Sequence, residues 1–239
     1  MIDISEYKKP ALQFSGGKDS LALLYLYKDV LDDLTVYHLD TGDSCPETQK
    51  IVDWAKEWIP HFEIIQSDVK TWRDSYGYPV DLVPAKAHHI GVSYGMNDFT
   101  LTNRFDCCFS NIMKPMHDRM IEDGVDCVIR GTKVADAGKI PSDGKDEFYD
   151  VILPIRDWSH QDVFDYLDSV GAPKNEVYNY FKAISAPECM GCTAWWDDGK
   201  AAYLKDRHPE EYAIYRTRLG LIADTINSHI TELTSELVA

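Results

Sequence analysis

One short stretch of the chain combines the residue types that bind anions. Residues 14–20 read FSGGKDS, followed by an apolar run that predicts a buried helix from residue 21. Glycines let backbone N–H groups approach an anion, the helix N-terminus adds partial positive charge, and the lysine and hydroxyls complete a cradle. The aspartate favours the helix dipole and is placed to hold a divalent cation. This predicts a phosphate site formed by Ser15, Gly16, Gly17, Lys18, Asp19 and Ser20, with a plain serine-capped glycine turn as the alternative.

Two later loops carry polar residues that we expect at the same place. Asp40, Thr41 and Gly42 follow a predicted strand, so the Asp40 carboxylate is expected to reach a ribose hydroxyl or a metal ion; a plain turn aspartate is the alternative. Arg130, Gly131, Lys133 and Lys139 follow a later strand. Basic side chains clustered in an acidic protein suit phosphate or sulfate, whereas a solvated lysine loop is the alternative. We expect the catalytic side chains to be Lys18, Asp19 and Asp40.

Four cysteines form two pairs that only a fold can bring together. Cys107 and Cys108 are adjacent, and Cys189 and Cys192 form a C-x-x-C motif about eighty residues later. Four thiolates suit an iron–sulfur cluster or a closed zinc site, and spacing alone does not choose between them. Buried or redox-active free thiols are the remaining alternative. Cys127 is predicted to lie in the core, and Cys45, in the loop after Asp40, is a candidate nucleophile.

The elements that must position these residues alternate between strand and helix. Strands are predicted at residues 11–14, 34–39, 61–66, 125–130 and 149–155, and helices at 21–27, 47–58, 110–122, 159–170, 197–207 and 209–237. This order predicts an α/β, Rossmann-like, mostly parallel sheet with helices on both faces and a cysteine-containing helical C-terminal extension. Residues 69–106 are predicted to be a long functional loop or lid with short local structure. We expect one compact unit, with a nucleotide-binding domain at 1–185 and the extension at 186–239 packed on it.

Charge and hydropathy limit the partners. The 24 basic and 40 acidic side chains give a formal net charge of −16, which disfavours a large nucleic-acid surface. The apolar runs are too short to cross a bilayer, and the start resembles no signal peptide, so we expect a cytoplasmic protein with no membrane partner. The apolar stripe of the last predicted helix requires a partner surface, which is either the body of the domain or a second copy in a homodimer.

Six segments together resemble a known superfamily and one family within it. FSGGKDS is similar to the PP-loop of the adenine nucleotide α-hydrolase superfamily, and LDTGDSCPET is similar to a segment of the phosphoadenosine phosphosulfate (PAPS) reductase family. That family includes adenylyl sulfate reductases, ATP sulfurylase small subunits and DNA phosphorothioation enzymes. The other similar segments, in the family's order, are CCFSNIMKP, RGTKVADAGK, PIRDWSHQDVFDYL and ECMGCTAW.

The resemblance implies a PP-loop enzyme of sulfur metabolism that binds ATP or a related adenine nucleotide. It also implies a [4Fe–4S] cluster on the four paired cysteines, with Zn²⁺ as the alternative. Sulfonucleotide reductases use a nucleophilic cysteine in a C-terminal segment such as ECGLH, and the residues after Cys192 contain no cysteine. Those reductases also tend to have a degraded PP-loop, whereas SGGKDS is retained here.

Both departures favour Mg²⁺-dependent cleavage of ATP between the α and β phosphates, with adenylyl transfer and release of pyrophosphate. The alternatives are a PAPS or adenylyl sulfate reductase that uses Cys45 or a separate thiol protein, and a non-catalytic nucleotide-binding or cluster-sensing module. The expected partners are a small nucleotide and a sulfur donor or thiol reductant protein.

Overall fold

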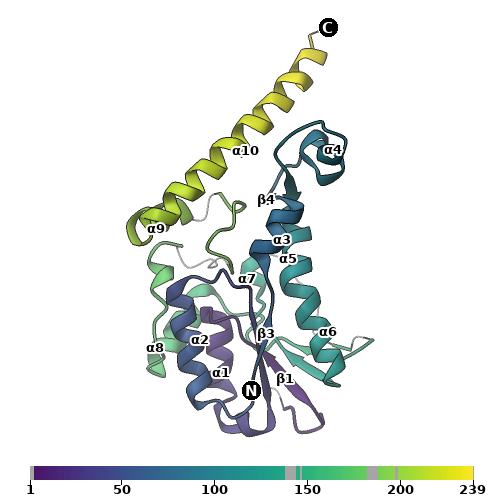
Figure 1. The fold of residues 1–239 in the computed structure, drawn as a ribbon. Helices are drawn as coiled ribbons and strands as arrows, with labels where there is room; N and C mark the ends of the chain where they lie inside the picture. Colours follow the sequence, from purple (N-terminus) through teal and green to yellow (C-terminus); the bar gives the residue numbers. More distant parts are fainter. Residues whose placement is uncertain (1–2, 138–143, 146, 182–187, 197–198, 239) are drawn as a thin grey trace.

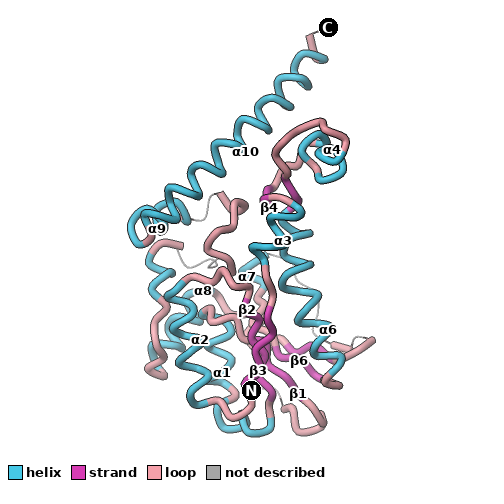
Figure 2. Tube along the Cα trace, in the orientation of Figure 1, coloured by secondary structure: helices cyan, strands magenta, loops and turns pink. Residues whose placement is uncertain are grey.

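A five-stranded sheet forms the centre of the computed structural model (Figures 1 and 2). The structure describes residues 3–137, 144–145, 147–181, 188–196 and 199–238. The strands lie in the order β3-β2-β1-β6-β7, and every neighbouring pair is parallel. Their bounds are β1 (Pro10–Gln13), β2 (Thr35–Asp40), β3 (Phe62–Gln66), β6 (Cys127–Ile129) and β7 (Asp150–Ile152). The α/β, Rossmann-like prediction is therefore confirmed, with each strand within two or three residues of its predicted bounds.

Helices cover both faces of this sheet because alternate strand residues are apolar on each side. On one face, Leu12 and Val36 share a core with α1 (Lys18–Leu26), α2 (Pro46–Trp58) and α8 (His160–Ser169). On the other face, Ala11 and Tyr37 pack against Met116 and Met120 of α6 (Lys114–Glu122). Cys127 is fully buried in the first of these cores, as predicted.

Local sequence signals account for several element ends. Pro46 begins α2, where a missing N–H costs nothing, and Ser159 and Asp162 form the predicted capping box of α8. A short 3₁₀ segment (Lys28–Asp33) joins α1 to β2, and α7 (Val134–Ala137) follows β6. The residues after α8 form a 3₁₀ turn at Glu176–Asn179, labelled η4.

The segment from residue 69 to residue 106 is more structured than predicted. It contains α3 (Val69–Tyr76), α4 (His89–Ser93) and a short 3₁₀ turn (Ala85–Ala87), together with a separate parallel pair, β4 (Tyr78–Val80) and β5 (Leu101–Asn103). Strands of three residues are too short to show a period in sequence. The segment ends in α5 (Arg104–Cys108), which continues through a π-helical turn (Phe109–Met113) into α6.

The chain ends in two helices, α9 (Lys200–Arg207) and α10 (Pro209–Glu236). In Figure 1, α10 extends from α9 to the C-terminus at the top of the view. The predicted start of the first, Asp197, lies outside the described residues. Tyr215 of α10 is buried beside α9, and Ile222 packs on Val80 and Leu101 of the small sheet. The apolar stripe of α10 thus finds part of its partner surface in the same chain. Among the helices that the structure describes, none is both long and apolar enough to span a bilayer.

Candidate nucleotide and thiol site

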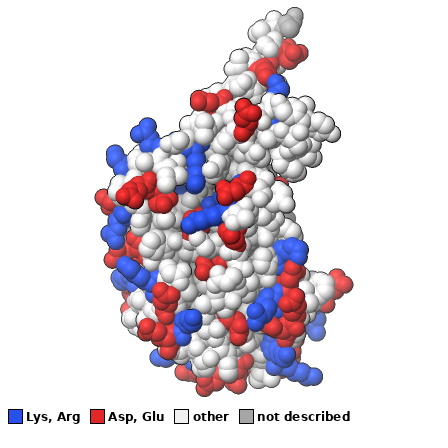
Figure 3. Space-filling model, viewed as in Figure 1, with Lys and Arg blue, Asp and Glu red and all other residues white. Residues whose placement is uncertain are grey.

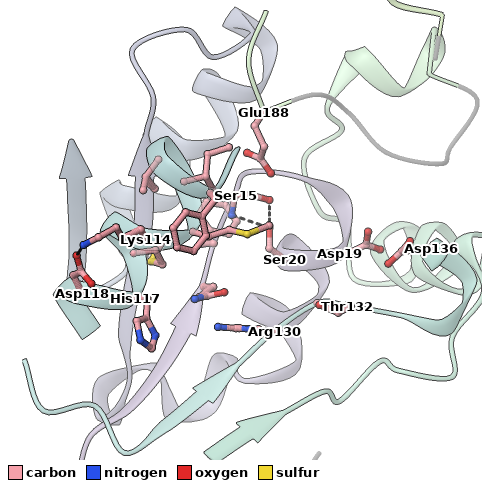
Figure 4. Close-up of a pocket in the computed structure, with 18 of the residues that line it drawn as sticks. Ser15, Asp19, Ser20, Lys114, His117, Asp118, Arg130, Thr132, Asp136 and Glu188 are labelled. Carbon is pink, nitrogen blue, oxygen red and sulfur yellow. Dashed lines mark hydrogen bonds and ion pairs between the residues drawn. The ribbon is translucent and has the colours of Figure 1, made fainter. Parts of the chain in front are cut away.

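A cavity of about 860 Å³ lies between the carboxyl ends of β1 and β6. The strand order reverses at this point, because β2 and β3 follow β1 on one side and β6 and β7 lie on the other. Ligands of open α/β sheets bind at such a switch point. Of the predicted site residues, Ser15, Asp19 and Ser20 from the PP-loop, together with Arg130 and Gly131, line the cavity. Figure 4 shows Ser15, Ser20 and Arg130 around one space. Apolar side chains of Leu39, Phe109, Ile112, Met113 and Met116 complete the wall, which suits a purine ring.

Glycines of the PP-loop and of the loop after β6 occupy positions that leave little room for a side chain. Gly16 has φ +79°, a value that favours glycine, and a Cβ there would lie 2.9 Å from side-chain atoms of both Thr48 and Val52. Gly17 is the N-cap of α1, with no side-chain cap of its own. Gly131 approaches closely from the neighbouring loop, because a Cβ there would lie 3.1 Å from Asp19. These contacts explain why the turn and the loop after β6 are both glycine-bearing.

A buried charge network lies directly beneath the turn. Lys18 Nζ is 2.8 Å from Asp19 Oδ2, and Lys133 Nζ is 2.7 Å from Asp19 Oδ1 and 2.9 Å from Asp136 Oδ1. Both lysines are buried, and neither lines the cavity. Burial lowers the pKa of Lys18, and the Asp19 carboxylate opposes that change. The network therefore holds two ammonium groups close behind the cavity wall rather than in it.

Arg130 brings an unsatisfied cation to the cavity. Its Nε is a buried donor with no hydrogen-bond partner among the described residues, and its Nη2 donates to the Tyr149 hydroxyl at 3.3 Å. The same hydroxyl lies 2.7 Å from His117 Nδ1. The sequence alone did not identify Tyr149 or His117 as site residues. Neither belongs to a motif of its own, and the available signal was that each follows a segment similar to the PAPS reductase family. Arg130 lines the cavity, and a guanidinium at that position is suited to an oxyanion.

Asp40 does not take the place that the sequence predicts for it. Its carboxylate accepts a hydrogen bond from Gly42 N at 2.8 Å, forming a local turn, and neither Asp40, Thr41 nor Gly42 lines the cavity. Thr41 lies instead beside the cysteines, 3.5 Å from Cys189 Sγ. The loop after β2 therefore contacts the thiol cluster.

A segment that the sequence analysis did not single out closes over the PP-loop. The backbone N–H of Lys18 donates to the Tyr178 hydroxyl at 2.9 Å, and Asn175 Nδ2 donates to Gly16 O at 3.3 Å and Thr48 Oγ1 at 3.0 Å. Burial raises the pKa of Tyr178, so its hydroxyl keeps its proton. The Tyr178 hydroxyl thus accepts a hydrogen bond from one of the N–H groups that have no partner within α1, and it still has a proton to donate.

The fold brings the two cysteine pairs together. Cys107, Cys189 and Cys192 share a buried cluster with Val69 and Ala194, and Cys108 borders it. Burial raises the pKa of Cys108 to about 11, with the neighbouring Cys107 and Cys192 acting in the same direction. Within the described part of the chain, no three His, Cys, Asp or Glu side chains form a ready-made ligand set for a metal ion.

A buried guanidinium faces these thiols. Arg73 Nη1 lies 2.6 Å from Asp43 Oδ2, both side chains are nearly inaccessible to solvent, and Arg73 Nε has no hydrogen-bond partner among the residues described. Asp43 also accepts from Gly191 N at 3.0 Å, which ties the C-x-x-C loop to the loop after β2. Both cysteine pairs adjoin the cavity, since Phe109 and Glu188, which line it, are the chain neighbours of Cys108 and Cys189.

Cys45 is poorly suited to be a nucleophile. It is 1 % exposed among Val177, Phe181 and Tyr203, and burial raises its pKa to about 11. A thiol with that pKa is almost entirely protonated at neutral pH. The sequence prediction for Cys45 therefore lacks structural support.

The predicted basic loop is placed only in part. Arg130, Gly131 and Lys133 meet the PP-loop as described above, whereas Lys139 lies outside the described residues. The charges on the face drawn in Figure 3 are mixed, with Lys and Arg interspersed among Asp and Glu. The cavity lining is mixed as well, since Lys114 and Arg130 lie there together with Asp19, Asp118, Asp136 and Glu188.

Comparisons with known proteins bear on the fold of the chain. Residues 9–79 match the family model of the phosphoadenosine phosphosulfate reductase domain. The fold is similar to that of PAPS reductase from Candida auris in a phosphate complex, with a TM-score of 0.53, 16% identity, and coverage of 74% of this chain and 79% of that one. No curated protein sequence is similar enough to count as a match. Residues 9–79 are thus similar to the PAPS reductase domain, as the motifs of this stretch predicted, and the fold of the chain is similar to that of PAPS reductase.

Proposed function

We propose that this protein binds ATP or a related adenine nucleotide in the cavity between β1 and β6 and cleaves ATP between the α and β phosphates. The family match supports a function related to sulfonucleotides. The observation that carries the finer proposal is the complete PP-loop at the rim of an 860 Å³ cavity with an apolar wall. The C. auris PAPS reductase was crystallised with phosphate, which is consistent with an oxyanion site in this fold.

Each part of the site has a role in this reaction. The apolar wall would hold the adenine, and the Ser15 and Ser20 hydroxyls with the turn N–H groups would hold the leaving pyrophosphate. Arg130 would bind a phosphate oxygen with its guanidinium, while Lys18 and Lys133 stabilise negative charge from behind the wall. Asp19 and Asp136, which border the cavity, would hold the Mg²⁺ that accompanies ATP and neutralises its phosphates.

The four clustered cysteines would hold a [4Fe–4S] cluster, with Zn²⁺ as the alternative. Four thiols suit either group by ligand type, although no three of them are already arranged as a ligand set in the described residues, and the unpaired Arg73 Nε is a donor suited to a sulfur anion. A bound cluster would supply a redox or structural centre next to the nucleotide, whereas zinc would supply a structural one only. Metal analysis and an absorption spectrum after anaerobic purification distinguish these two groups.

Turnover assays test the proposal. Incubation with ATP and Mg²⁺ should yield AMP and pyrophosphate, and Lys18→Ala should lower that rate by about 100-fold or more, because one preorganised positive charge close behind the cavity wall is lost. Lys28→Ala is the control, since Lys28 is an exposed residue just beyond the other end of the same helix. Sulfite formed from PAPS or adenylyl sulfate with a thiol reductant would instead identify a reductase. Tight nucleotide binding without any product would identify a non-catalytic module.

A further inference from the structure

A buried lysine lies against the C-x-x-C loop. Lys200 is the first residue of α9, and its side chain is 2 % exposed. Its ammonium donates to the carbonyl oxygens of Cys189 at 3.1 Å and Cys192 at 2.6 Å. One side chain therefore bridges the backbone at both cysteines of the motif.

This ammonium has no carboxylate within ion-pair distance in the part of the chain that the structure describes. Its other neighbour is the ring of Tyr215, with the centroid 5.7 Å from Nζ. The other buried ion pair at the loop, Arg73 with Asp43, is already balanced. Among the described residues, this ammonium thus has no counter-charge. Burying an unpaired ammonium is strongly unfavourable, so an anion is expected nearby.

The cysteines are the groups that can supply that anion. Cys189 and Cys192 carry the carbonyls that Lys200 contacts, and they lie in one buried cluster with Cys107. Metal binding deprotonates thiols, and a four-thiolate group around either an iron–sulfur cluster or zinc carries net negative charge. Neutral thiols would leave the ammonium unbalanced.

We propose that Lys200 is a positioning residue for the metal centre, holding the C-x-x-C loop in its ligating shape and balancing the charge of the bound group. This inference rests on the metal centre assigned under the proposed function. It adds that the affinity for the metal depends on the Lys200 ammonium, which is not itself a metal ligand. It also explains why Lys200, alone among the described lysines of α9 and α10, has a buried ammonium with no described carboxylate partner.

Three variants separate charge from shape. Lys200→Met removes both the charge and the donors, whereas Lys200→Gln keeps an amide able to donate to the two carbonyls but removes the charge. Lys205→Met is the matched control, because Lys205 is exposed on the same helix. Each protein is reconstituted anaerobically with ferrous iron and sulfide, and separately with zinc. Metal per chain, the absorption spectrum and chelator competition are then measured.

We expect metal affinity to fall by about 10–100-fold in both the Met and Gln variants, as for other groups that support metal ligands, and to stay unchanged in the control. For an iron–sulfur cluster, loss of the cation should also lower the reduction potential. A tenfold shift of the one-electron equilibrium corresponds to about 59 mV. If the Gln variant binds metal as the wild type does, hydrogen bonding alone is sufficient and the charge role is wrong.

Thermal melts provide a readout independent of activity. The metal-free Met variant should melt at or above the metal-free wild type, because it no longer buries an unpaired charge, whereas the loaded Met variant should melt below the loaded wild type. A lysine with only a packing role would lower both melts equally, and failure of both variants to fold would also overturn the inference. If the wild type binds neither iron and sulfide nor zinc, both the proposed metal centre and the role of Lys200 are wrong. ATP cleavage, assayed separately, would be unaffected by that result.

Discussion

The glycine turn makes the most direct structural prediction, through Gly16→Ala. A non-glycine residue in the left-handed region costs about 1–2 kcal/mol, and Gly16 has φ +79°. The new Cβ would also lie 2.9 Å from Thr48 Cγ2 and from Val52 Cγ2, both on α2. Forcing a methyl group into such a contact costs about 1–3 kcal/mol more. The expected loss of unfolding free energy is therefore about 2–5 kcal/mol.

A second glycine isolates the packing part of this cost. Gly171 has φ +66° and nothing within 4 Å of its Cβ position, so Gly171→Ala should lose only the backbone cost of about 1–2 kcal/mol. Urea denaturation of both variants gives the difference, provided that the m-value is unchanged. Calorimetry should also show weaker ATP binding for Gly16→Ala alone. Equal destabilisation by the two substitutions would refute the packing of α2 against the turn.

Three further predictions follow from buried polar groups. Lys133→Met should destabilise the fold by about 2–4 kcal/mol, because Asp19 and Asp136 lose their shared cation; chemical denaturation measures this, and a loss below about 0.5 kcal/mol would contradict it. Cys45, with a pKa of about 11, should have about one thiolate in a thousand at pH 8. Mass spectrometry should therefore find it unalkylated by iodoacetamide until urea unfolds the chain, and rapid native labelling would show that it is accessible. Burial lowers the pKa of His38 below 6.5, so below that pH the unfolded chain binds a proton that the folded chain does not. Stability should consequently fall as the pH drops through and below 6.5, and His38→Asn, whose amide can replace the contact of Nδ1 with Phe14 O, should remove that part of the pH dependence.

Local patterns in the sequence were sufficient for the fold and for the phosphate turn. Strand–helix alternation, Pro46 at the start of a helix and the Ser159 capping box depend on neighbouring residues, and the structure has each of them where they were predicted. The grouping of glycines, lysine and hydroxyls in residues 15–20 also belongs to one short stretch. Short-range signals of this kind are readable because the interactions that cause them lie within a few residues.

Only the tertiary structure decided what surrounds that turn. Asp40 ends the predicted strand, yet its carboxylate closes a local turn and stays out of the cavity. Tyr178 and Lys200 carry no motif, and their roles come from contacts with residues far away in the chain or across a loop. The sequence alone determined that this protein has a PP-loop and two cysteine pairs. Which side chains face the cavity, and which cation lies beside the thiols, depended on long-range packing, because burial and charge balance are set by residues that the chain brings together only when it folds.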